Sequence, residues 1–500
     1  MCVAVPGWRL CFFPAVLPAP SANLSAVPAL QSVDWNQWRQ AAAIPERTPY
    51  LLSPAFEYDV ELNGFFLSGE MLGHAWNTQD GYARDLRAFL NFLWRNRNRT
   101  SWRDVTAADH VAYLVWRRTD PDGPRIDHST WDREVTAVNQ FYAWQVRAQH
   151  LPSNPIPQRA RRPGSHVAGR GTASATTAAT YSHGAGREKI EWVPPTSYRR
   201  WRDVGIRGYT PDGLPDVGFR GRWAARNALF SDVMVRTGLR LSEQTALTVF
   251  EMPLDRGLGG YQRFWLPASI AKGSSARWVY VPESLVSEAI TYSLIDRPDV
   301  IKSAQEAGRY RRWPRAFIVE DPERPVARSP EGGRIKVAHL DRDERRRLLI
   351  DGPGGLEPAG FWLTETGDPV SRSGWKEIFR AANLRCRGAG VDLWVHPHSL
   401  RHSFAVITLE QLQRGHIANL VDLNPGQRST YSMIFGDPLD WVRRRLGHRS
   451  VVTTQIYLHA LAELEMHTRM MLVPDEWEDP RETPIDVLQN DRAHGAGVPI

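Results

Sequence analysis

A stretch without hydrophobic periodicity, residues 158–188, divides the chain into two parts. It opens with the basic run Arg159-Ala-Arg-Arg-Pro-Gly and continues mainly in Gly, Ala, Ser and Thr. Such a composition is typical of a flexible linker, and connections inside one domain are normally much shorter. The chain is therefore predicted to fold as two domains on either side of this segment rather than around one continuous core.

Helical periodicity fills the part of the chain before this linker. The apolar side chains from Tyr82 to Leu93 recur at i, i+4, i+7 and i+11, which places them on one face of a helix. Two more helices are expected over 107–117 and 130–149, and prolines end the second of them. Residues 66–157 are therefore predicted to form a small helical domain.

The two ends of the chain carry weaker signals. Residues 1–65 are rich in Pro and Ala and form an unassigned N-terminal extension, whereas 473–500 are predicted to be an acidic C-terminal tail. No run of about eighteen apolar residues, the least that a membrane-spanning helix needs, occurs in the sequence. The sequence thus predicts a cytoplasmic protein without a membrane partner.

The amino-acid composition limits which partners and cofactors the protein can bind. Lys and Arg number 62 against 55 Asp and Glu, and the net charge of +7 favours polyanionic partners. The cysteines Cys2, Cys11 and Cys386 are too few for a disulfide framework or a four-cysteine zinc site, which fits a reducing compartment. The chain also lacks the Gly-x-x-x-x-Gly-Lys loop that would bind the phosphates of ATP.

The part after the linker, residues 189–472, is predicted to mix helices with a short sheet. A helix is expected over 222–236, followed by strands at 264–270 and 278–282. The charged, Pro- and Gly-rich stretch 300–360 is interpreted as an insertion. Helices are expected to resume near Ser373, Ser399, Leu439 and Val451.

Two short stretches of this part carry candidate functional residues. In Thr237-Gly-Leu-Arg-Leu-Ser-Glu243 the glycine allows a tight turn, Arg240 follows it, and Glu243 can orient Arg240. Lys272 lies in the turn between the two expected strands, and Arg277 returns on the second strand. Taken singly, a surface salt bridge and a solvated lysine would give the same pattern.

A third stretch, His396-Pro-His-Ser-Leu-Arg-His402, begins a helix with cationic side chains. His398 and Arg401 lie three residues apart and therefore share one helix face. A cation at a helix start lies at the unfavourable end of the dipole, so this placement invites an anionic partner. A fourth stretch, Leu446-Gly-His-Arg-Ser, precedes an expected helix. Tyr457 lies on that helix, nine residues after His448 of the stretch.

Taken together and in this order, the four stretches resemble the tyrosine recombinase (phage integrase) family. The resemblance covers about residues 75–157 and 189–470. The positions that match the catalytic motifs of the family are Arg240, Lys272, His398, Arg401, His448 and Tyr457.

The resemblance implies a mainly α fold with a small β-sheet, built as a two-domain clamp on double-stranded DNA. The N-terminal helical domain would be a core-binding domain, and the second a mixed α/β catalytic domain. The implied function is that of a site-specific DNA recombinase, or integrase, which cuts and rejoins DNA through a 3′-phosphotyrosyl intermediate without metal, ATP or other cofactor. Relatives generally act as homotetramers on DNA, so this assembly is expected here, with an accessory directionality factor as a further candidate partner.

The matching residue types suit this reaction. Arg240 and Arg401 can hold the non-bridging phosphate oxygens bidentately and keep their charge. Tyr457 is the implied nucleophile, and a phenol with a pKa near 10 needs such cationic neighbours. Lys272 is the candidate general acid for the leaving 5′-oxygen, because an alkoxide leaves poorly without a proton.

The histidines divide into two groups. His398 and His448 can donate hydrogen bonds to the phosphate, and one of them is expected to take the proton of the nucleophile. Supporting roles are assigned to Glu243, His396, His402 and His459. A metal held by these histidines is the competing interpretation, and the order of the motifs with Arg401 between the histidines argues against it. DNA contacts are predicted for Arg95, Arg97, Arg99, Arg159, Arg161, Arg162 and Arg277.

Two other functions stay open at this point. A type IB topoisomerase-like enzyme would share the chemistry but relax supercoils as a monomer, and a catalytically silent DNA-binding regulator would keep only the fold. The intact set around Tyr457 argues against the regulator. The stretches 300–360 and 411–435 lengthen the usual spacing between the motifs, and the sequence assigns them no role.

Overall fold

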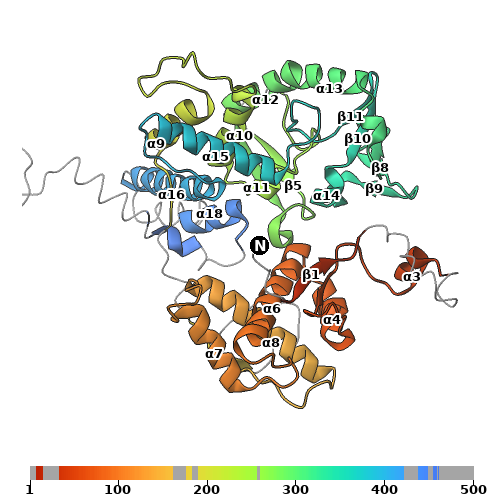
Figure 1. Ribbon diagram of the computed structural model, residues 1–500. Helices are drawn as coiled ribbons and strands as arrows, with labels where there is room; N and C mark the ends of the chain where they lie inside the picture. Colours follow the sequence, from red (N-terminus) through yellow and green to blue (C-terminus); the bar gives the residue numbers. More distant parts are fainter. Residues whose placement is uncertain are drawn as a thin grey trace, which may run out of the picture. The chain divides into compact units, whose positions relative to one another are not determined.

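The computed structural model describes residues 7–14, 33–160, 176–182, 190–255, 260–421, 437–448, 454–458 and 460, without the side chains of 415–421. Contacts divide the chain into two compact units, Met1–Glu188 and Lys189–Ile500. The first unit is mainly helical and the second combines helices with small sheets (Figure 1), which confirms the predicted fold class. None of the described helices is long and apolar enough to cross a membrane.

The first unit is built on three helices whose facing sides bury an aromatic core. These helices are α6 (Trp76–Asn96), α7 (Ala107–Arg118) and α8 (His128–Arg147). Phe89, Trp131 and Tyr142 are fully buried between them. The three helices predicted from periodicity are thus present, with ends that differ by a few residues.

The packed part of this unit begins before residue 66. Its earlier elements are β1 (Arg9–Phe12), α3 (Trp35–Ala41), β2 (Pro49–Leu52), α4 (Val60–Leu67) and α5 (Gly69–Leu72). β1 pairs antiparallel with β2, and α4 buries Phe65 and Phe66 in the core of the unit. The side chain of Asn63 donates to the carbonyl of Leu51 and accepts from its N–H, which ties α4 to β2. The predicted boundary at residue 66 is therefore too late.

The described pieces of the predicted linker also pack on the first unit. β3 (Gln158–Ala160) pairs antiparallel with β4 (Thr176–Ala178), and Ala178 is fully buried. The indole of Trp131 donates to the carbonyl of Thr180 at 2.9 Å. The expectation of a flexible linker is therefore wrong for these pieces, because β4 and the residues after it pack against α8. Arg161 and Arg162 lie outside the described residues.

Helices of the second unit surround α10 (Ala224–Thr237), which packs against α12, α16 and β6. The others are α9 (Pro195–Trp201), α11 (Leu241–Gln244), α12 (Glu283–Leu294), α13 (Asp296–Glu306), α14 (Arg342–Arg345), α15 (Arg372–Gly388), α16 (Pro397–Val421) and α18 (Pro438–Leu446), with short turns η2 (Arg202–Ile206), η3 (Lys272–Ser274), η4 (Tyr310–Arg312) and η5 (Val337–His339). Residues 454–458 are also helical. Trp201, Trp362 and Trp375 are buried in the core.

The described residues of this unit form two sheets, both between residues 261 and 358. β5 (Tyr261–Leu266) pairs antiparallel with β6 (Arg277–Pro282). The predicted first strand, 264–270, is wrong at its end, because Pro267 cannot continue the hydrogen-bond ladder. The stretch predicted as an insertion forms a five-stranded sheet in the order β11-β10-β7-β8-β9. Its strands are β7 (Phe317–Val319), β8 (Val326–Arg328), β9 (Arg334–Lys336), β10 (Leu348–Gly352) and β11 (Gly355–Pro358).

The structure describes only some of the residues after α15 for which the sequence made predictions. α16 continues to Val421, so the first part of the 411–435 stretch is helical. Residues 422–436 and 461–500, including the predicted acidic tail, lie outside the described residues, as does His459.

Gly238 shows why the turn before Arg240 needs a glycine. It caps the C-terminus of α10 at φ 66° and ψ 18°, the left-handed region that other residues enter at a cost. A Cβ atom at this position would overlap the ring of Phe404 on α16. The turn therefore depends on glycine both for its backbone conformation and for the close approach of α16.

We expect Gly238→Ala to destabilise the second unit by roughly 2–5 kcal/mol, as the sum of left-handed strain and overpacking. Gly213→Ala is the matched control, because Gly213 has φ 83° but no atom within 4 Å of a Cβ. It should cost only about 1–2 kcal/mol. Chemical denaturation of both variants measures the difference, and equal losses would contradict the overlap with Phe404.

Candidate active site

The carboxylate of Glu243 collects hydrogen bonds from three segments of the second unit. The backbone N–H and Nη1 of Arg240 donate to it at 3.0 and 2.9 Å, and Nη2 of Arg277 donates at 2.7 Å. The backbone N–H of Lys272 adds a contact of 3.3 Å. Although burial acts to raise it, Arg277, Arg240 and Arg401 hold the pKa of Glu243 at about 2. The group is therefore a buried anion that orients Arg240 and fixes the turn of Lys272.

Arg401 is the most buried cation of the site, with 1% of its surface exposed. Its Nη1 donates to the carbonyl of Gly238, and its Nη2 donates to the carbonyl of Leu446 at 2.5 Å. The same Nη2 lies 3.3 Å from Nε2 of His448. Burial, followed by the charge of Arg240, lowers the pKa of Arg401 to about 9. The guanidinium thus connects α16 to the turn at Gly238 and to the turn at Gly447. Its bonds to these turns are to neutral carbonyls, so they do not balance its charge.

Tyr457 lies in the same cluster and is 1% exposed. Its hydroxyl is 3.0 Å from Nδ1 of His402, and the ring of His448 stacks nearly parallel to its own at 6.3 Å between centroids. Burial raises the pKa of Tyr457, whereas Arg401 and Arg240 oppose this rise. The phenol is therefore protonated near neutral pH and hydrogen-bonded to His402, for which only a supporting role was predicted.

Burial, and after it the charge of Arg401 and other neighbours, lowers the pKa of three histidines in the site. Burial and then Arg401 lower the pKa of His448 to about 3, and burial and then His398 lower that of His402 to about 4. His398 is exposed at the start of α16, with its ring 4.3 Å from that of His402. Its pKa is lowered by partial burial and then by Arg401, Arg240 and Lys272. Neutral imidazoles can accept a proton, which protonated ones cannot.

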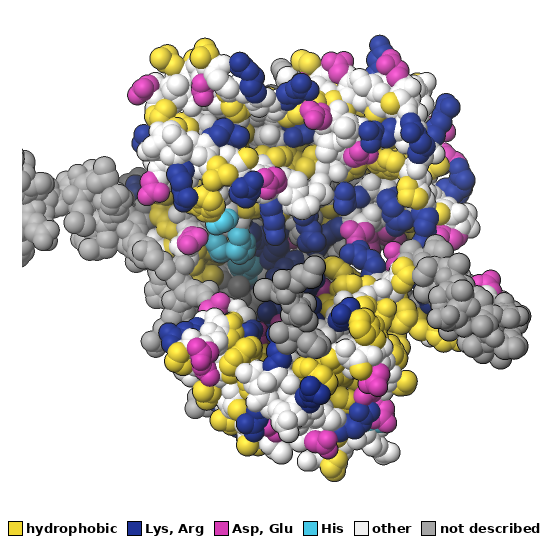
Figure 2. All heavy atoms as spheres, viewed as in Figure 1, with side chains coloured by type: hydrophobic (Ala, Val, Ile, Leu, Met, Phe, Trp, Pro, Cys, Tyr) yellow, Lys and Arg dark blue, Asp and Glu magenta, His cyan; other side chains and the backbone are white. Residues whose placement is uncertain are grey.

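The structure brings together the residues that the sequence motifs selected. On the face shown in Figure 2, histidine side chains lie beside a group of Lys and Arg side chains of the second unit. Lys272 is exposed in its turn, and Gly273 and Ser274 after it have positive φ angles of 66° and 57°. Thr454 was not anticipated: its hydroxyl lies 3.0 Å from Nδ1 of His448 and fixes that ring.

Arg277, for which a DNA contact was predicted, is buried and paired inside the protein. Arg277 is 6% exposed, its Nη2 is paired with Glu243, and its Nε donates to the carbonyl of Arg445 at 2.8 Å. Its donors are therefore committed inside the protein. The pattern carried this signal, because Arg277, Val279 and Val281 alternate on the buried face of β6.

Three arginines near the end of α6 were predicted to contact DNA. Arg97 pairs with Asp109 at 2.7 Å, and the guanidinium of Arg99 lies 4.9 Å from the ring centroid of Trp94. Arg95 is exposed in the last turn of the helix. Arg95 and Arg99 stay candidates for a phosphate contact, whereas Arg97 would have to leave Asp109 first.

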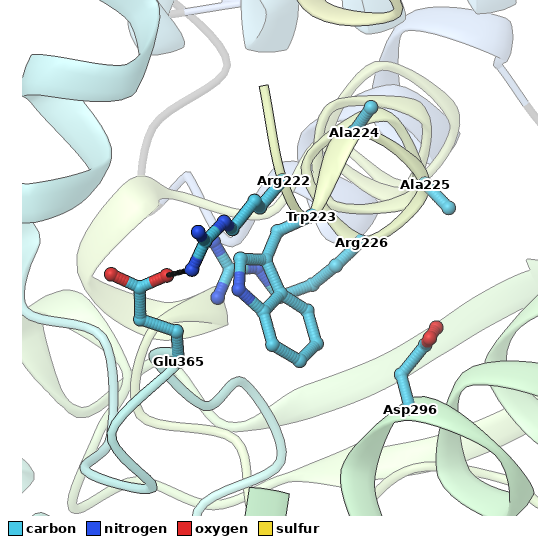
Figure 3. A pocket seen from close by; sticks show the side chains of 7 residues that line it. All are labelled: Arg222, Trp223, Ala224, Ala225, Arg226, Asp296 and Glu365. Atoms are coloured by element: carbon cyan, nitrogen blue, oxygen red, sulfur yellow. Dashed lines mark ion pairs between the residues drawn. The ribbon is translucent and has the colours of Figure 1, made fainter. Parts of the chain in front are cut away.

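A pocket elsewhere in the second unit contains none of these residues. Figure 3 shows it at the start of α10, where Arg222 forms an ion pair of 3.7 Å with Glu365 across its opening. Among the described residues, no three His, Cys, Asp or Glu side chains are grouped as metal ligands would be.

The low pKa of Glu243 predicts a pH dependence of stability. A carboxyl whose pKa falls from about 4.3 to about 2 on folding stabilises the fold above its ordinary pKa, by roughly 3 kcal/mol at pH 7. This contribution is lost as the pH falls toward 2, and roughly half remains at pH 3. The Tm difference between wild type and Glu243→Gln should therefore shrink between pH 7 and pH 3.

The control for this measurement is Glu377→Gln on α15. Glu377 pairs with Arg380 but is exposed, so its loss should hardly change Tm at either pH. A Tm difference for Glu243→Gln that stays constant or widens on acidification would contradict the buried anion.

Comparison with known proteins agrees with this geometry. The family model of the phage integrase N-terminal SAM-like domain matches residues 70–149. Tyrosine recombinase XerC of Lactobacillus delbrueckii subsp. bulgaricus is 21% identical over 378 residues, which cover 76% of this chain and 86% of that protein. Tyrosine recombinase XerD of Oceanobacillus iheyensis is 21% identical over 403 residues, 81% of this chain and 94% of that protein.

Solved structures give weaker likenesses. XerH recombinase in a post-cleavage complex with a palindromic difH substrate is similar over 82% of this chain and 88% of its own, at 13% identity and a TM-score of 0.42. The Tn1549 transposon integrase in complex with a circular intermediate DNA covers 82% of this chain and 98% of its own, at 12% identity and a TM-score of 0.42. The sequence matches, together with the motifs gathered around Tyr457, lead to one conclusion: the chain belongs to the family of tyrosine-type site-specific recombinases.

Proposed function

We propose that this recombinase cuts and rejoins double-stranded DNA through a 3′-phosphotyrosyl intermediate on Tyr457, and that it uses neither a metal nor ATP. The observation that carries the proposal is the charge imbalance around Tyr457. Burial first, and then the charge of neighbouring cations, lowers the pKa values of Arg401, His402 and His448, and Glu243 is the buried anion that offsets part of this charge at Arg401. A phosphodiester placed among them would relieve this repulsion, so the site suits an anionic substrate.

The bond changes follow from the residues. The oxygen of Tyr457 attacks the phosphorus, the bond from phosphorus to the 5′-oxygen breaks, and Arg240 and Arg401 stabilise the charge on the non-bridging oxygens. The 5′-hydroxyl of a second strand then attacks the phosphotyrosyl bond and releases Tyr457. One phosphodiester is exchanged for another, so the cycle needs no ATP.

Two residues are proposed to move protons. His402 is best placed to accept the proton of Tyr457, because its Nδ1 lies 3.0 Å from the hydroxyl and a bound phosphate would raise its pKa of about 4. Lys272 would donate a proton to the leaving 5′-oxygen. His398 and His448 would then hydrogen-bond the phosphate rather than act as the base.

The partner follows from the same chemistry. The chain carries a net charge of +7, and both units present arginines such as Arg95 and Arg444 to solvent. Phosphate contacts would supply much of the affinity for DNA, and this affinity would fall with salt. A homotetramer on two duplexes and an accessory directionality factor stay predictions from the family resemblance.

Tyr457→Phe should bind DNA as wild type does and form no covalent adduct, because it keeps the ring but lacks the nucleophile. The probe is a set of nicked duplexes made from the DNA that flanks the gene. An adduct in SDS joined through the 3′ end of the DNA should appear with wild type and with Tyr261→Phe, whose tyrosine is exposed on β5. An adduct with Tyr457→Phe would overturn the nucleophile, and relaxation of supercoils without strand exchange would favour the topoisomerase alternative.

Arg401→Ala should slow cleavage on the order of 10²- to 10³-fold, because a preorganised donor to the developing charge is lost. DNA binding at moderate salt should change little, since Arg401 is buried. Arg444→Ala is the control, because Arg444 is exposed on α18 and pairs with Asp440. A loss of DNA binding as large as the loss of cleavage would contradict a role for Arg401 in the transition state.

A further inference from the structure

The five-stranded sheet β7–β11, which the sequence left without a role, packs on the segment that follows Arg240. The N–H of Val249 donates to the carbonyl of Ala359 at 2.9 Å, and the N–H of Phe361 donates to the carbonyl of Leu247 at 3.0 Å. Val249 and Phe250 pack against the apolar core of the sheet. Backbone hydrogen bonds and apolar contacts therefore attach the sheet to residues 247–250, which follow α11.

Arg345 anchors α14 in this arrangement. It is 1% exposed and pairs with Glu251 at 2.8 Å. Its other donors reach the carbonyls of Leu340 and Val337, at 3.1 and 2.9 Å. A buried, fully bonded guanidinium holds its surroundings in one geometry. The position of α14 is therefore fixed relative to Glu251 and the segment that follows α11.

The neighbouring Arg342 connects α14 to the turn that carries Lys272. Its Nε and Nη2 both donate to the carbonyl of Ile270, at 2.9 and 2.6 Å. The hydroxyl of Ser269 donates to the carbonyl of Ala338 at 2.8 Å, which adds a second link, to η5 between β9 and α14. Ile270 precedes Lys272 by two residues, so these bonds hold the backbone just before the proposed acid.

We propose that the sheet β7–β11 acts as a brace for the general acid, and that Arg342 is the positioning residue that fixes the turn of Lys272. The inference rests on the proposed function, since it assigns Lys272 the role of proton donor. The exposed turn of Lys272 contains two positive-φ residues and is closed by short-range bonds, from the N–H of Ser274 to the carbonyl of Ala271 and from the hydroxyl of Ser275 to the carbonyl of Lys272. The backbone just before the turn is also held at two points. Glu243 accepts from the N–H of Lys272, and Arg342 donates to the carbonyl of Ile270.

The expected effect is specific to proton donation. A displaced turn should slow cleavage on the order of tenfold to a hundredfold, because small misplacements of a catalytic group are costly. A sulfur atom in place of the bridging 5′-oxygen leaves without a proton, so the position of Lys272 should then no longer matter. A merely structural defect would slow both substrates equally.

The experiment uses the full chain and a nicked duplex that gives the Tyr457-dependent adduct, made with either oxygen or sulfur at the scissile 5′ position. Arg342→Ala and Arg342→Lys should both be slow on the oxygen duplex and match wild type on the sulfur duplex, because lysine keeps the charge but not the paired donation. The control, Arg346→Ala, removes an exposed arginine four residues along and should match wild type on both. Lys272→Ala combined with Arg342→Ala should be no slower than Lys272→Ala alone.

Each of three results would overturn the brace. These are equal losses for Arg342→Ala on the two duplexes, wild-type cleavage of the oxygen duplex by Arg342→Lys, and additive losses in the double variant. If wild type forms no adduct through Tyr457 on any duplex, the proposed function fails and the inference falls with it. If wild type forms the adduct but sulfur does not rescue the Arg342 variants, only the inference fails.

Discussion

A single buried carboxylate, that of Glu243, holds the active-site loops of the second unit together. It accepts from Arg240, from Arg277 on β6 and from the backbone N–H of Lys272, so it links the turn after α10 to the β5–β6 hairpin. Removing one partner of such a buried pair leaves the other charge unpaired, which typically costs about 3–5 kcal/mol. The interaction therefore fixes both the position of Arg240, one of the two arginines proposed to bind the phosphate, and the place from which the proposed acid acts.

The same carboxylate cannot neutralise the cluster it organises. Arg240, Arg277 and Arg401 all act on Glu243, and Arg401 also lowers the pKa values of the histidines beside Tyr457. A site with this excess of positive charge is destabilised by its own repulsion when empty. A bound phosphodiester would be attracted by these cations and would reduce the repulsion between them. The attraction would be strongest in the transition state, where the phosphorus group carries the most negative charge.

Residue type and spacing predicted much of this site, because its motifs lie at helix ends and turns whose geometry is local. Gly238, Arg401 and Tyr457 were selected in that way, and the structure places their elements side by side. The direction of Arg277 was missed although the alternation along β6 carried it. The roles of His402 and Arg342 could not be read from sequence, since their partners lie 55 and 72 residues away and are set by tertiary packing.

The contrast between Lys272 and Arg401 explains why a brace would be useful. Arg401 is buried on α16 and bonded to two carbonyls, so packing alone fixes it. Lys272 must instead reach solvent to meet the leaving oxygen of a bound duplex, and an exposed turn gains little from packing. The structure holds the backbone just before that turn, at the carbonyl of Ile270 and at the N–H of Lys272, while leaving the side chain unburied. Backbone anchoring of this kind limits the motion of the acid while its side chain stays exposed to meet a bound duplex.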